Sequence, residues 1–552
     1  MAEKKLIFGI DLGTTYSCIA YVDENGQPTV VKNGEGSNIT PSVVYFEDTG
    51  NIIAGRDAKD SMKTEPDRSI AFVKRQIGRE KLAITVDGKD YTPEEISAYI
   101  LKKITNDASK LLDTEVRDVV ITCPAYFGTQ EREATKNAGI IAGLNVIEII
   151  SEPTAAAIYY GVAKSQKAKT VLVYDLGGGT FDVTVIAIDD EGKITVVYST
   201  GDHTLGGKDW DEVIKNDMMH ALCEANVLDE SEISEETNSE LVFSAEEVKQ
   251  KLTSHDKARE TINVDEGKIK FEISRVDFED KTEHLIEQTI DFTKEAIEGA
   301  KKKGFSIDEI LLVGGSTRMP QVENKLSEFG IEIKHEDPDE AVAKGAAIYA
   351  LGAYAGLVEF WAGQSAEKMA NLSEEEKNEA ANYAEEASVS LLALPGLKGH
   401  KMTEIVTVAT TKSYAVKVLQ DDKPICFNMI QKNVPLQDGK YTFSSVFGTH
   451  EDNQDSAQIK VYETDVDEEY FEIPGEDFVL GEAELKLSGK LPAGSKLEVT
   501  FTLDREGILK VTGKDLTDGN VIEATMKAHG DLSMTKEEVQ AAKEKSKGLV
   551  VM

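Results

Sequence analysis

The stretch YDLGGGTFDV, residues 174–183, decides the fold that we expect for this chain. An apolar run ends at Asp175, three glycines follow, and a second apolar run begins after Thr180. The same plan recurs near the start of the chain as GIDLGTTY, residues 9–16, where Asp11 precedes the turn. Each copy predicts a strand, a tight glycine turn and a second strand. The recurrence indicates a duplicated unit.

Two further pairs of segments repeat in the same order. DVVITCPAYF, residues 118–127, parallels DEILLVGGST, residues 308–317, and each predicts a strand that ends in a turn. EPTAAAIYYG, residues 152–161, parallels the helical stretch of residues 337–352, and residues 208–305 form an insertion in the second copy. We therefore predict an α/β fold in which two related lobes face each other across a cleft. Each lobe directs its glycine turn into that cleft, which makes it a ligand site.

Composition excludes several classes of protein. The 552 residues are enough for about three or four structural units. A formal net charge of −39 repels phosphate backbones and anionic lipid, so we expect neither nucleic acid nor a membrane as a partner. No secretory signal and no run of about eighteen apolar residues is visible. The four cysteines are scattered without a CxxC pair, which is typical of unpaired thiols in a reducing compartment and predicts a cytoplasmic location.

The sequence changes character after residue 355. Residues 356–400 contain SEEEKNEAANYAEEA, which predicts an acidic helical spacer, and SVSLLALPGLKG, which predicts an apolar linker. Short β-branched runs then alternate with turn signals over residues 401–530, a pattern that predicts a β-sandwich. Residues 531–552 predict one short helix that opens with the capping box TKEE. Residues 1–355 are thus expected to form the duplicated domain.

The two glycine turns have the composition of phosphate-binding loops. Small residues directly after a strand let backbone N–H groups approach phosphate oxygens, and hydroxyls at the same turn bind those oxygens or the water shell of a metal. Asp11 and Asp175 end the strands beside the loops, where we expect them to hold Mg²⁺ through retained water. The loops are Gly13, Thr14, Thr15 and Tyr16 in the first copy, and Gly177, Gly178, Gly179 and Thr180 in the second.

Each turn also has an ordinary structural interpretation. A single DLGG turn is more often a plain hairpin, and neither loop matches the GxxxxGKS or GxGxxG patterns, because strand follows strand in both. GGSTR, residues 314–318, is either an ordinary strand-to-helix turn or a third backbone-approach site at which Arg318 stacks on a base. The presence of two loops in duplicated lobes favours the ligand-binding interpretation.

The chain resembles the 70-kDa heat-shock protein (DnaK-like) chaperones over residues 4–355, through GIDLGTTYSC, KRQIGR, TCPAYF, SEPTAAAIYYG, DLGGGTFDV, GDHTLGG and VGGSTRMP. The later segments DNQDSAQIKVYE and LEVTFTLDREGILKVTGKD resemble that family's peptide-binding domain. The resemblance implies an actin-like duplicated ATPase domain with ribonuclease-H-like lobes, related to the sugar kinases, followed by a β-sandwich peptide-binding domain. It implies ATP or ADP and Mg²⁺ as cofactors and slow ATP hydrolysis. Hydrolysis would be coupled to the binding and release of unfolded or extended hydrophobic polypeptides, with a J-domain co-chaperone and a nucleotide-exchange factor as partners in protein folding and the stress response.

The resemblance also assigns roles to residues. The catalytic set would be Lys74, reaching the γ-phosphate, with Glu152, Asp175, Thr180 and Asp182 around the attacking water. Metal waters would be held by Asp11 and Asp175, and the β-phosphate by Thr14, Thr15 and Tyr16. The phosphates would be wrapped by Gly177, Gly178, Gly179, Gly206 and Gly207, and the adenosine enclosed by Glu246, Lys249, Thr253, Gly314, Gly315, Ser316, Arg318 and Asp339. Pro124 and Arg132 match positions that relay the nucleotide state to the linker.

Four departures from the family pattern matter. Gln250 stands where a basic residue usually shares the base-stacking role, which predicts weaker nucleotide binding. The segment GDHTLGGKD exchanges His203 and Thr204 and places Lys208 at an acidic position, which alters the surroundings of the γ-phosphate. The peptide pocket would be lined by Phe447, Ala457, Ile459 and Val461, each of which also suits plain sandwich core, and Ala457 replaces a larger aliphatic residue. We expect most of the helical lid that follows the sandwich to be missing, so that peptide is released quickly.

Two other functions stay open at this point. Gln250, Lys208 and a linker that lacks the family's usual Asp-Val-Thr-Pro continuation permit a nucleotide-binding co-chaperone or exchange-type scaffold with little ATPase activity. A small-molecule kinase of the same superfamily is the third candidate. It would leave the sandwich and the apolar linker without a role.

Overall fold

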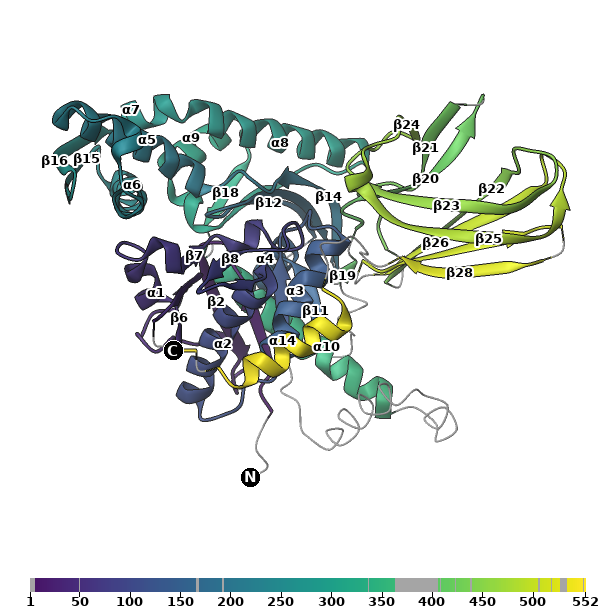
Figure 1. Ribbon diagram of the computed structural model, residues 1–552, viewed down its shortest axis with the longest axis horizontal. Helices are drawn as coiled ribbons and strands as arrows, with labels where there is room; N and C mark the ends of the chain where they lie inside the picture. Colours follow the sequence, from purple (N-terminus) through teal and green to yellow (C-terminus); the bar gives the residue numbers. More distant parts are fainter. Residues whose placement is uncertain are drawn as a thin grey trace.

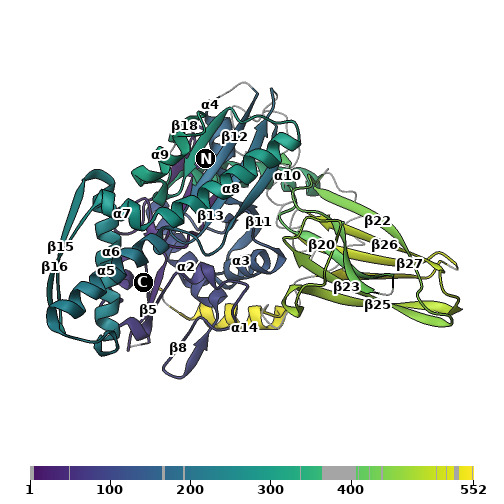
Figure 2. The same cartoon turned by 90° about the horizontal axis from the view of Figure 1, so that it is seen from above.

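The structure is a computed structural model. It describes residues 5–48, 50–164, 168–190, 193–335, 337–362, 406–407, 409–421, 423–436, 439–504, 507–517, 519–526, 534–549 and 551–552. Two lobes lie side by side with a strand-rich domain against one end of them (Figures 1 and 2). None of the described helices is long and apolar enough to span a membrane.

Lobe I is built on a mixed sheet with the strand order β11-β10-β1-β2-β3. The central strand β1 pairs antiparallel with β2 and parallel with β10. The sheet comprises β1 (Phe8–Asp11), β2 (Tyr16–Val22), β3 (Pro28–Val30), β10 (Asp118–Cys123) and β11 (Asn145–Ser151). The strands β1 and β10 are almost wholly buried, as expected where elements cover both faces of a sheet.

The sheet of lobe II repeats this pairing strand for strand, in the order β18-β17-β12-β13-β14-β19. The central strand β12 pairs antiparallel with β13 and parallel with β17. The repeated strands are β12 (Lys169–Leu176), β13 (Phe181–Ile188), β14 (Ile194–Asp202), β17 (Glu309–Val313) and β18 (Glu332–His335). The topology confirms the predicted duplication and the α/β, actin-like fold class.

The lobes are joined where α4 (Glu152–Lys164) crosses α10 (Ala341–Ala362), the two helices that the sequence predicted as a repeated pair. Small residues make the close crossing possible. A Cβ added to Gly345 would lie 1.7 Å from the carbonyl oxygen of Ala155, and one added to Gly9 would lie 2.1 Å from the nitrogen of Ala347. The alanines of both helices form part of one buried cluster with strands from both sheets.

Lobe I carries a smaller sheet of order β6-β5-β7, which leads through β6 into the short helix α1. Its larger helices are α2 and α3. The elements are β4 (Thr40–Pro41), β5 (Val43–Phe46), β6 (Ile52–Ala54), α1 (Arg56–Ser61), η1 (Pro66–Arg68), β7 (Ser69–Ala71), η2 (Val73–Arg75), β8 (Ile84–Val86), β9 (Lys89–Tyr91), α2 (Pro93–Leu112) and α3 (Thr129–Ile141).

The insertion predicted in the second copy forms a helical subdomain of lobe II with a two-stranded hairpin. It comprises α5 (Gly207–Asn226), η3 (Glu230–Glu232), α6 (Glu235–Ser254), β15 (Lys257–Val264), β16 (Gly267–Ser274), α7 (Arg275–Lys281) and α8 (Glu283–Lys302). The GGSTR turn forms η4 (Gly315–Arg318), which leads into α9 (Pro320–Ser327). These helices cover the lobe II sheet and share one core cluster with it.

The strand-rich domain is a sandwich of a five-stranded and a four-stranded sheet, as predicted, with orders β24-β21-β20-β23-β25 and β22-β26-β27-β28. Alternate residues of both sheets form its core, in the manner of sheet-on-sheet packing. The strands are β20 (Ser413–Gln420), β21 (Lys423–Ile430), β22 (Lys440–Gly448), β23 (Gln454–Thr464), β24 (Tyr470–Phe471), β25 (Val479–Leu491), β26 (Lys496–Asp504), β27 (Leu509–Asp515) and β28 (Val521–Met526), with η6 (Glu476–Phe478) before β25.

Two segments connect the sandwich to the lobes. β19 (Val406–Thr407) pairs in parallel with β14 and extends the lobe II sheet, although the sequence places these residues within the strand-rich domain. α14 (Lys536–Lys547) begins at the predicted capping box and packs on α3 of lobe I. The spacer and linker predicted for residues 356–400 lie outside the described residues, except where α10 extends to Ala362.

Candidate active site

A cleft of about 680 Å³ opens between the two lobes, a volume within the range of small-molecule sites. It is lined from both lobes and from α6. The predicted residues on its wall are Asp11, Gly13, Thr14, Thr15, Tyr16, Lys74, Glu152, Asp175, Gly177, Gly178, Thr180, Glu246, Lys249, Thr253, Gly314, Gly315, Ser316, Arg318 and Asp339. Asp182, Gly179, Gly206 and Gly207 are not on the wall but lie directly behind it.

The two glycine loops fit against each other at the base of the cleft. A Cβ added to Gly178 would lie 1.6 Å from Oγ1 of Thr15, and one added to Gly179 would lie 2.3 Å from Cγ2 of Thr14. Behind them, a Cβ on Gly206 would lie 2.5 Å from the carbonyl carbon of Gly179. Gly178, Gly179 and Gly206 therefore have no room for a side chain, and the two loops pack closely against each other.

A buried cluster of charges stands beside these loops. The ammonium of Lys74, on η2, pairs with the carboxylate of Glu152 at the start of α4, and both side chains are almost fully buried. Burial, reinforced by the charge of Glu152, raises the pKa of Asp11 to about 7 and that of Asp175 well above its ordinary range. Burial alone would lower the pKa of Lys74, but the carboxylates of Glu152 and Asp11 outweigh it and the net shift is upward.

The third aspartate, Asp182, lies on β13 behind the second loop. Its Oδ2 accepts a hydrogen bond from the backbone N–H of Ala125 at 3.3 Å, and its Oδ1 is buried without a hydrogen-bond partner. Burial raises the pKa of Asp182, with the charge of Glu152 adding to the effect. A buried carboxylate oxygen without a partner is one of the rare groups that call for a ligand or a water.

The acidic cluster fits a cation that keeps its water. Among the described residues, no three His, Cys, Asp or Glu side chains converge to coordinate a metal ion directly. Asp11 and Asp175 nevertheless face the same cleft, one from the end of each central strand, and an excess of buried carboxylate is stabilised by a positive charge. Mg²⁺ suits such a site because it dehydrates reluctantly and is held through one or two carboxylates.

The far end of the cleft is formed by lobe II alone. Gly314 has a φ of 85°, and a Cβ there would lie 2.5 Å from the carbonyl oxygen of Leu176, so the GGSTR turn packs tightly on the second strand end. Arg318 forms an ion pair with Asp339 and is half exposed at the rim. This ion pair ties one nitrogen of its guanidinium to the turn that carries Asp339.

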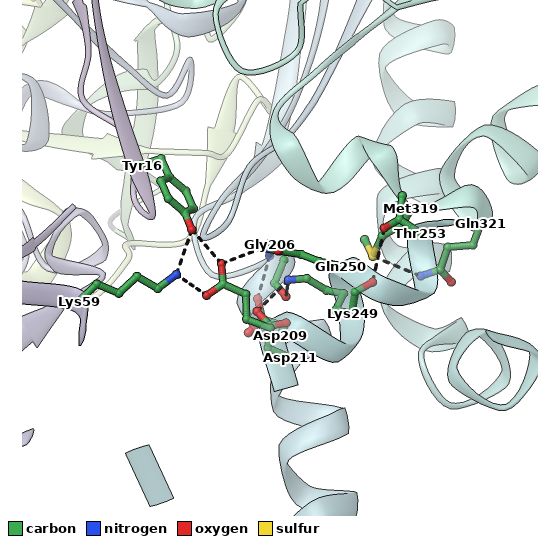
Figure 3. Close-up of polar contacts among 12 residues, drawn as sticks. Tyr16, Lys59, Gly206, Asp209, Asp211, Lys249, Gln250, Thr253, Met319 and Gln321 are labelled. Atoms are coloured by element: carbon green, nitrogen blue, oxygen red, sulfur yellow. Dashed lines mark hydrogen bonds and ion pairs between the residues drawn. The ribbon is translucent and has the colours of Figure 1, made fainter. Parts of the chain in front are cut away.

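Sequence reasoning missed three residues with contacts at or beside the cleft, and two of them, Lys59 and Asp211, are labelled in Figure 3. Lys59 of α1 donates to Glu246 of α6 at 2.5 Å and to the hydroxyl of Tyr16 at 2.9 Å. Asp211 accepts from Lys249 at 2.7 Å, which directs the lysine toward the first turn of α5. No motif marks Lys59 or Asp211.

The third missed residue, Arg75, follows Lys74 in the recognised KRQIGR segment, so a signal for it was present. Its Nε donates to the carbonyl oxygen of Gly179 at 2.7 Å, and its Nη2 donates to Asp209 at 2.7 Å. A second bond from Nη2 reaches the carbonyl oxygen of Thr204 at 2.9 Å. Arg75 thus fastens lobe I to the second glycine loop.

The residues that depart from the family pattern occupy different places. Lys208 lines the cleft, with its ammonium 4.8 Å from the ring centre of Phe72, and burial lowers its pKa. Gln250 also lines the cleft and donates to Glu246 at 3.3 Å. His203 packs edge-on against Tyr126 with the ring centres 3.9 Å apart, and burial, with the nearby charges of Arg79 and Lys412, lowers its pKa to about 2.

The predicted peptide residues lie on two strands of the sandwich. Phe447, on β22, packs edge to face with Phe427, with the ring centres 5.9 Å apart. Ile459 and Val461, on β23, are fully buried in the core, and Ala457 is partly buried at its margin.

The sandwich contacts both lobes close to the loop that follows β10. The carboxylate of Glu463 accepts from the backbone N–H of Thr129 at 3.0 Å, at the first turn of α3. From α3, Nε of Arg132 donates to the carbonyl oxygen of Phe127 in that loop at 3.1 Å, and Phe127 lies two residues beyond the Ala125 that bonds Asp182. The loop after Pro124 therefore touches the buried aspartate on one side and the sandwich on the other.

Lobe II makes its own contacts with the sandwich. Asn433 accepts from the backbone N–H of Ser199 at 2.8 Å, and the ammonium of Lys303 donates to the carbonyl oxygen of Asn433 at 2.6 Å.

The sequence is similar to known proteins over most of its length. A family model described as "Hsp70 protein" matches residues 7–356 and 396–549. "Chaperone protein DnaK" of Thermotoga petrophila is 38% identical over 560 residues, covering 99% of this chain and 84% of that protein. The protein of the same name from Thermosipho melanesiensis is 36% identical over 561 residues, with the same two shares. That from Halobacterium salinarum is 36% identical over 545 residues, covering 97% of this chain and 76% of the relative.

Proposed function

The chain belongs to the Hsp70 family, and from that premise we propose how its cleft and sandwich work together. It is an ATP-dependent molecular chaperone whose two-lobed domain is an ATPase. One observation carries the proposal: each lobe brings a buried aspartate and a glycine loop to one cleft, and the sandwich touches the loop that bonds the third aspartate.

We propose that ATP or ADP lies in the cleft with its phosphates between the two glycine loops. Both loops line that cleft, and the glycines of the second loop add no side chain to it. The base would lie between Arg318 and α6, where Gln250 replaces a cation, and the ribose near Glu246 and Lys249. The smaller cationic surface at Gln250 should weaken nucleotide binding.

Members of this family use Mg²⁺, which supplies charge neutralisation on the phosphates when it is bound. Asp11 and Asp175 would hold the waters of that ion, since they face the cleft from opposite lobes. Their raised pKa values fit this role, because the cluster has more buried carboxylate than Lys74 alone can balance.

Within this arrangement, each catalytic side chain has a separate task. Glu152 fixes the ammonium of Lys74, so that its positive charge faces the phosphate end of the cleft. The hydroxyl of Thr180 and the unpartnered Oδ1 of Asp182 would orient the attacking water. Phosphoryl transfer needs mainly positioning and charge neutralisation, so no covalent nucleophile is required.

We propose that hydrophobic peptide binds the sandwich beside Phe447 and Ala457, while the buried Ile459 and Val461 support that wall from inside. In the described part of the chain, α14 is the one helix after the sandwich, and it packs on lobe I. The groove is therefore uncovered by that helix in this arrangement, which favours fast peptide release.

A J-domain co-chaperone and a nucleotide-exchange factor are the partners that we propose, in keeping with the family. The four cysteines are all unpaired, which supports a role in a reducing compartment such as the cytoplasm.

Single-turnover ATP hydrolysis, measured with and without a hydrophobic peptide, tests the proposal. We expect peptide to accelerate hydrolysis. ATP binding without turnover would instead support the co-chaperone interpretation, and phosphorylation of a small-molecule acceptor would support the kinase interpretation.

A further inference from the structure

A short segment after α14 lies along the edge of the β6-β5-β7 sheet of lobe I. The backbone N–H of Met552 donates to the carbonyl oxygen of Ile52 at 3.0 Å, and the N–H of Ala54 donates to the carbonyl oxygen of Met552 at 3.0 Å. Val551 forms a parallel bridge with Ile52. We call Val551 and Met552 the edge segment. It satisfies two backbone groups of β6 on the side that β5 leaves open.

The side chain of Val551 anchors this contact. It is 7% exposed and belongs to the main hydrophobic cluster of lobe I, together with Ile52 and Ala54. Leu549 packs partly against the same cluster. Figure 1 shows the end of the chain beside β6, at the face of lobe I away from the sandwich.

The helix before the edge segment is fixed to lobe I as well. Val539 and Ala542 are buried against Ala98 of α2 and Ile141 of α3. Lys545 forms an ion pair with Glu95 at 2.8 Å, and Lys102 donates to the last turn of α14. The edge segment is thus delivered to β6 by a docked helix.

β6 is directly connected to the residues that close the cleft. It ends at Ala54, and Gly55, with a φ of 92°, forms the N-cap of α1. The N–H of Gly55 donates to Val43 on β5, and the N–H of Lys59 donates to Gly55. Lys59 is therefore five residues from a backbone group that the edge segment binds.

The helix α1 and the residues just after it contact α6 of lobe II. Lys59 binds Glu246 at 2.5 Å over the mouth of the cleft, and Oγ of Ser239 donates to the carbonyl oxygen of Met62 at 2.7 Å. Lys63 and Glu240 add an ion pair at 3.3 Å. These contacts join the two lobes beside the cleft, so we expect them to open before a nucleotide leaves.

We infer that the edge of β6 is a binding site for an extended apolar segment, occupied by Val551 and Met552 of the same chain, and that its occupancy holds α1 against α6 and slows nucleotide release. The inference rests on the proposed nucleotide site. The reason is that these elements are joined directly. The edge segment restrains β6, β6 leads into Gly55 at the N-cap of α1, and α1 carries Lys59. Loss of the edge segment leaves two polar backbone groups and an apolar surface without partners, which loosens the start of α1.

The test compares variants of the full chain by the rate at which a fluorescent N-methylanthraniloyl-ADP dissociates in Mg²⁺. Val551→Asp places a charge in the buried cluster, and Met552→Pro removes the N–H donor without adding a charge. Val521→Asp, at a site 57% exposed on β28, is the matched control. We expect dissociation about fivefold faster in both edge variants and unchanged in the control. Hydrogen exchange at the amide of Ala54 should accelerate in the same two variants.

A double variant, Val551→Asp with Lys59→Ala, tests whether the edge segment affects nucleotide release through Lys59. If the edge segment acts through Lys59, Val551→Asp should add little to the effect of Lys59→Ala alone. Wild-type dissociation rates in both edge variants, with Ala54 exchange accelerated, would overturn the inference and leave the nucleotide site intact. Failure of the wild type to bind the analogue would instead overturn the proposed function. A wild-type rate that slows with protein concentration would show that a second copy supplies the segment, against the inference.

Discussion

At the scale of single residues, catalysis and binding should separate at the second glycine loop. Asp175 and Thr180 line the cleft beside the second glycine loop, where we propose that the phosphates bind, whereas the base and ribose are expected to contact other residues. We predict that Asp175→Asn or Thr180→Ala slows ATP hydrolysis on the order of 100-fold, with a change of less than about tenfold in ATP affinity. Single-turnover kinetics and calorimetry measure the two quantities.

Asp291→Asn, on the exposed face of α8, is the control for that comparison. Equal losses of rate and affinity in the loop variants would show that these residues serve binding alone.

Glu463 predicts a pH dependence of domain docking. Burial at the interface raises its pKa to about 7, and the charge of Glu131 adds to this effect. The hydrogen bond from Thr129 and the charge of Lys412 oppose it. The other ionisable neighbours are Arg132 and Tyr414. Undocking would return the pKa to about 4.3. The docked state therefore binds the proton more tightly, so docking is favoured as the pH falls through 7 and opposed above it.

Energy transfer between labels on the sandwich and on lobe I should report this change. We expect transfer to rise between pH 8 and pH 6, and Glu463→Gln to abolish the rise while Glu484→Gln, on the exposed face of β25, preserves it. A rise that persists unchanged in Glu463→Gln would refute the assignment.

The candidate site could be predicted from the sequence where motifs carry it. The glycine loops, Asp11 and Asp175 are local features, because each loop follows its own strand directly. Lys59 and Asp211 could not be found in this way. The role of Lys59 arises from the placement of lobe I against lobe II, and that of Asp211 from the packing of α5 on α6; no short stretch of sequence encodes either.

At the scale of elements, the crossing of α4 and α10 leaves no room for a larger side chain. The backbone of Ala155 lies where a side chain at position 345 would be. To make room for such a side chain, one helix would have to shift together with the sheet on which it packs. We predict that Gly345→Ala destabilises the two-lobed domain by about 1–3 kcal/mol. Chemical denaturation followed by the fluorescence of the two tryptophans, Trp210 and Trp361, measures this change.

Gly356, on the same helix, has no neighbour within 4 Å of an added Cβ. Gly356→Ala should therefore leave stability unchanged or raise it by about 0.5–1 kcal/mol, because only the helix propensity changes. Similar effects at both positions would mean that the helices do not cross as described.

The duplication could be predicted at this scale because both copies keep the order of strand, turn and helix. The pairing of β19 with β14 could not, since a two-residue strand carries no periodic signal and follows residues 363–405, which lie outside the described chain. The contacts of α14 could not be predicted for a related reason. Its apolar positions indicate that one face is buried, but not which surface covers that face.

At the scale of the whole molecule, charge should govern the response to salt. A net charge of −39 on one chain produces self-repulsion, which counter-ions screen with a Debye length of about 10 Å at 0.1 M. We predict that raising the NaCl concentration from about 0.05 M to about 0.5 M increases the unfolding temperature by about 2–4 °C. Scanning calorimetry measures this shift, with sucrose at equal osmolality as the uncharged control.

An equal shift in sucrose would attribute the effect to solute exclusion instead of screening. No change in either solute would mean that the acidic groups are distributed so that their mutual repulsion is small.

The fit of Thr15 against Gly178, and of Thr14 against Gly179, has a consequence for the symmetry of the molecule. The two sheets repeat the same strand pairing, but the two loops are complementary in shape and cannot be exchanged for one another. A bulkier residue in one loop would need a smaller one in the opposite loop.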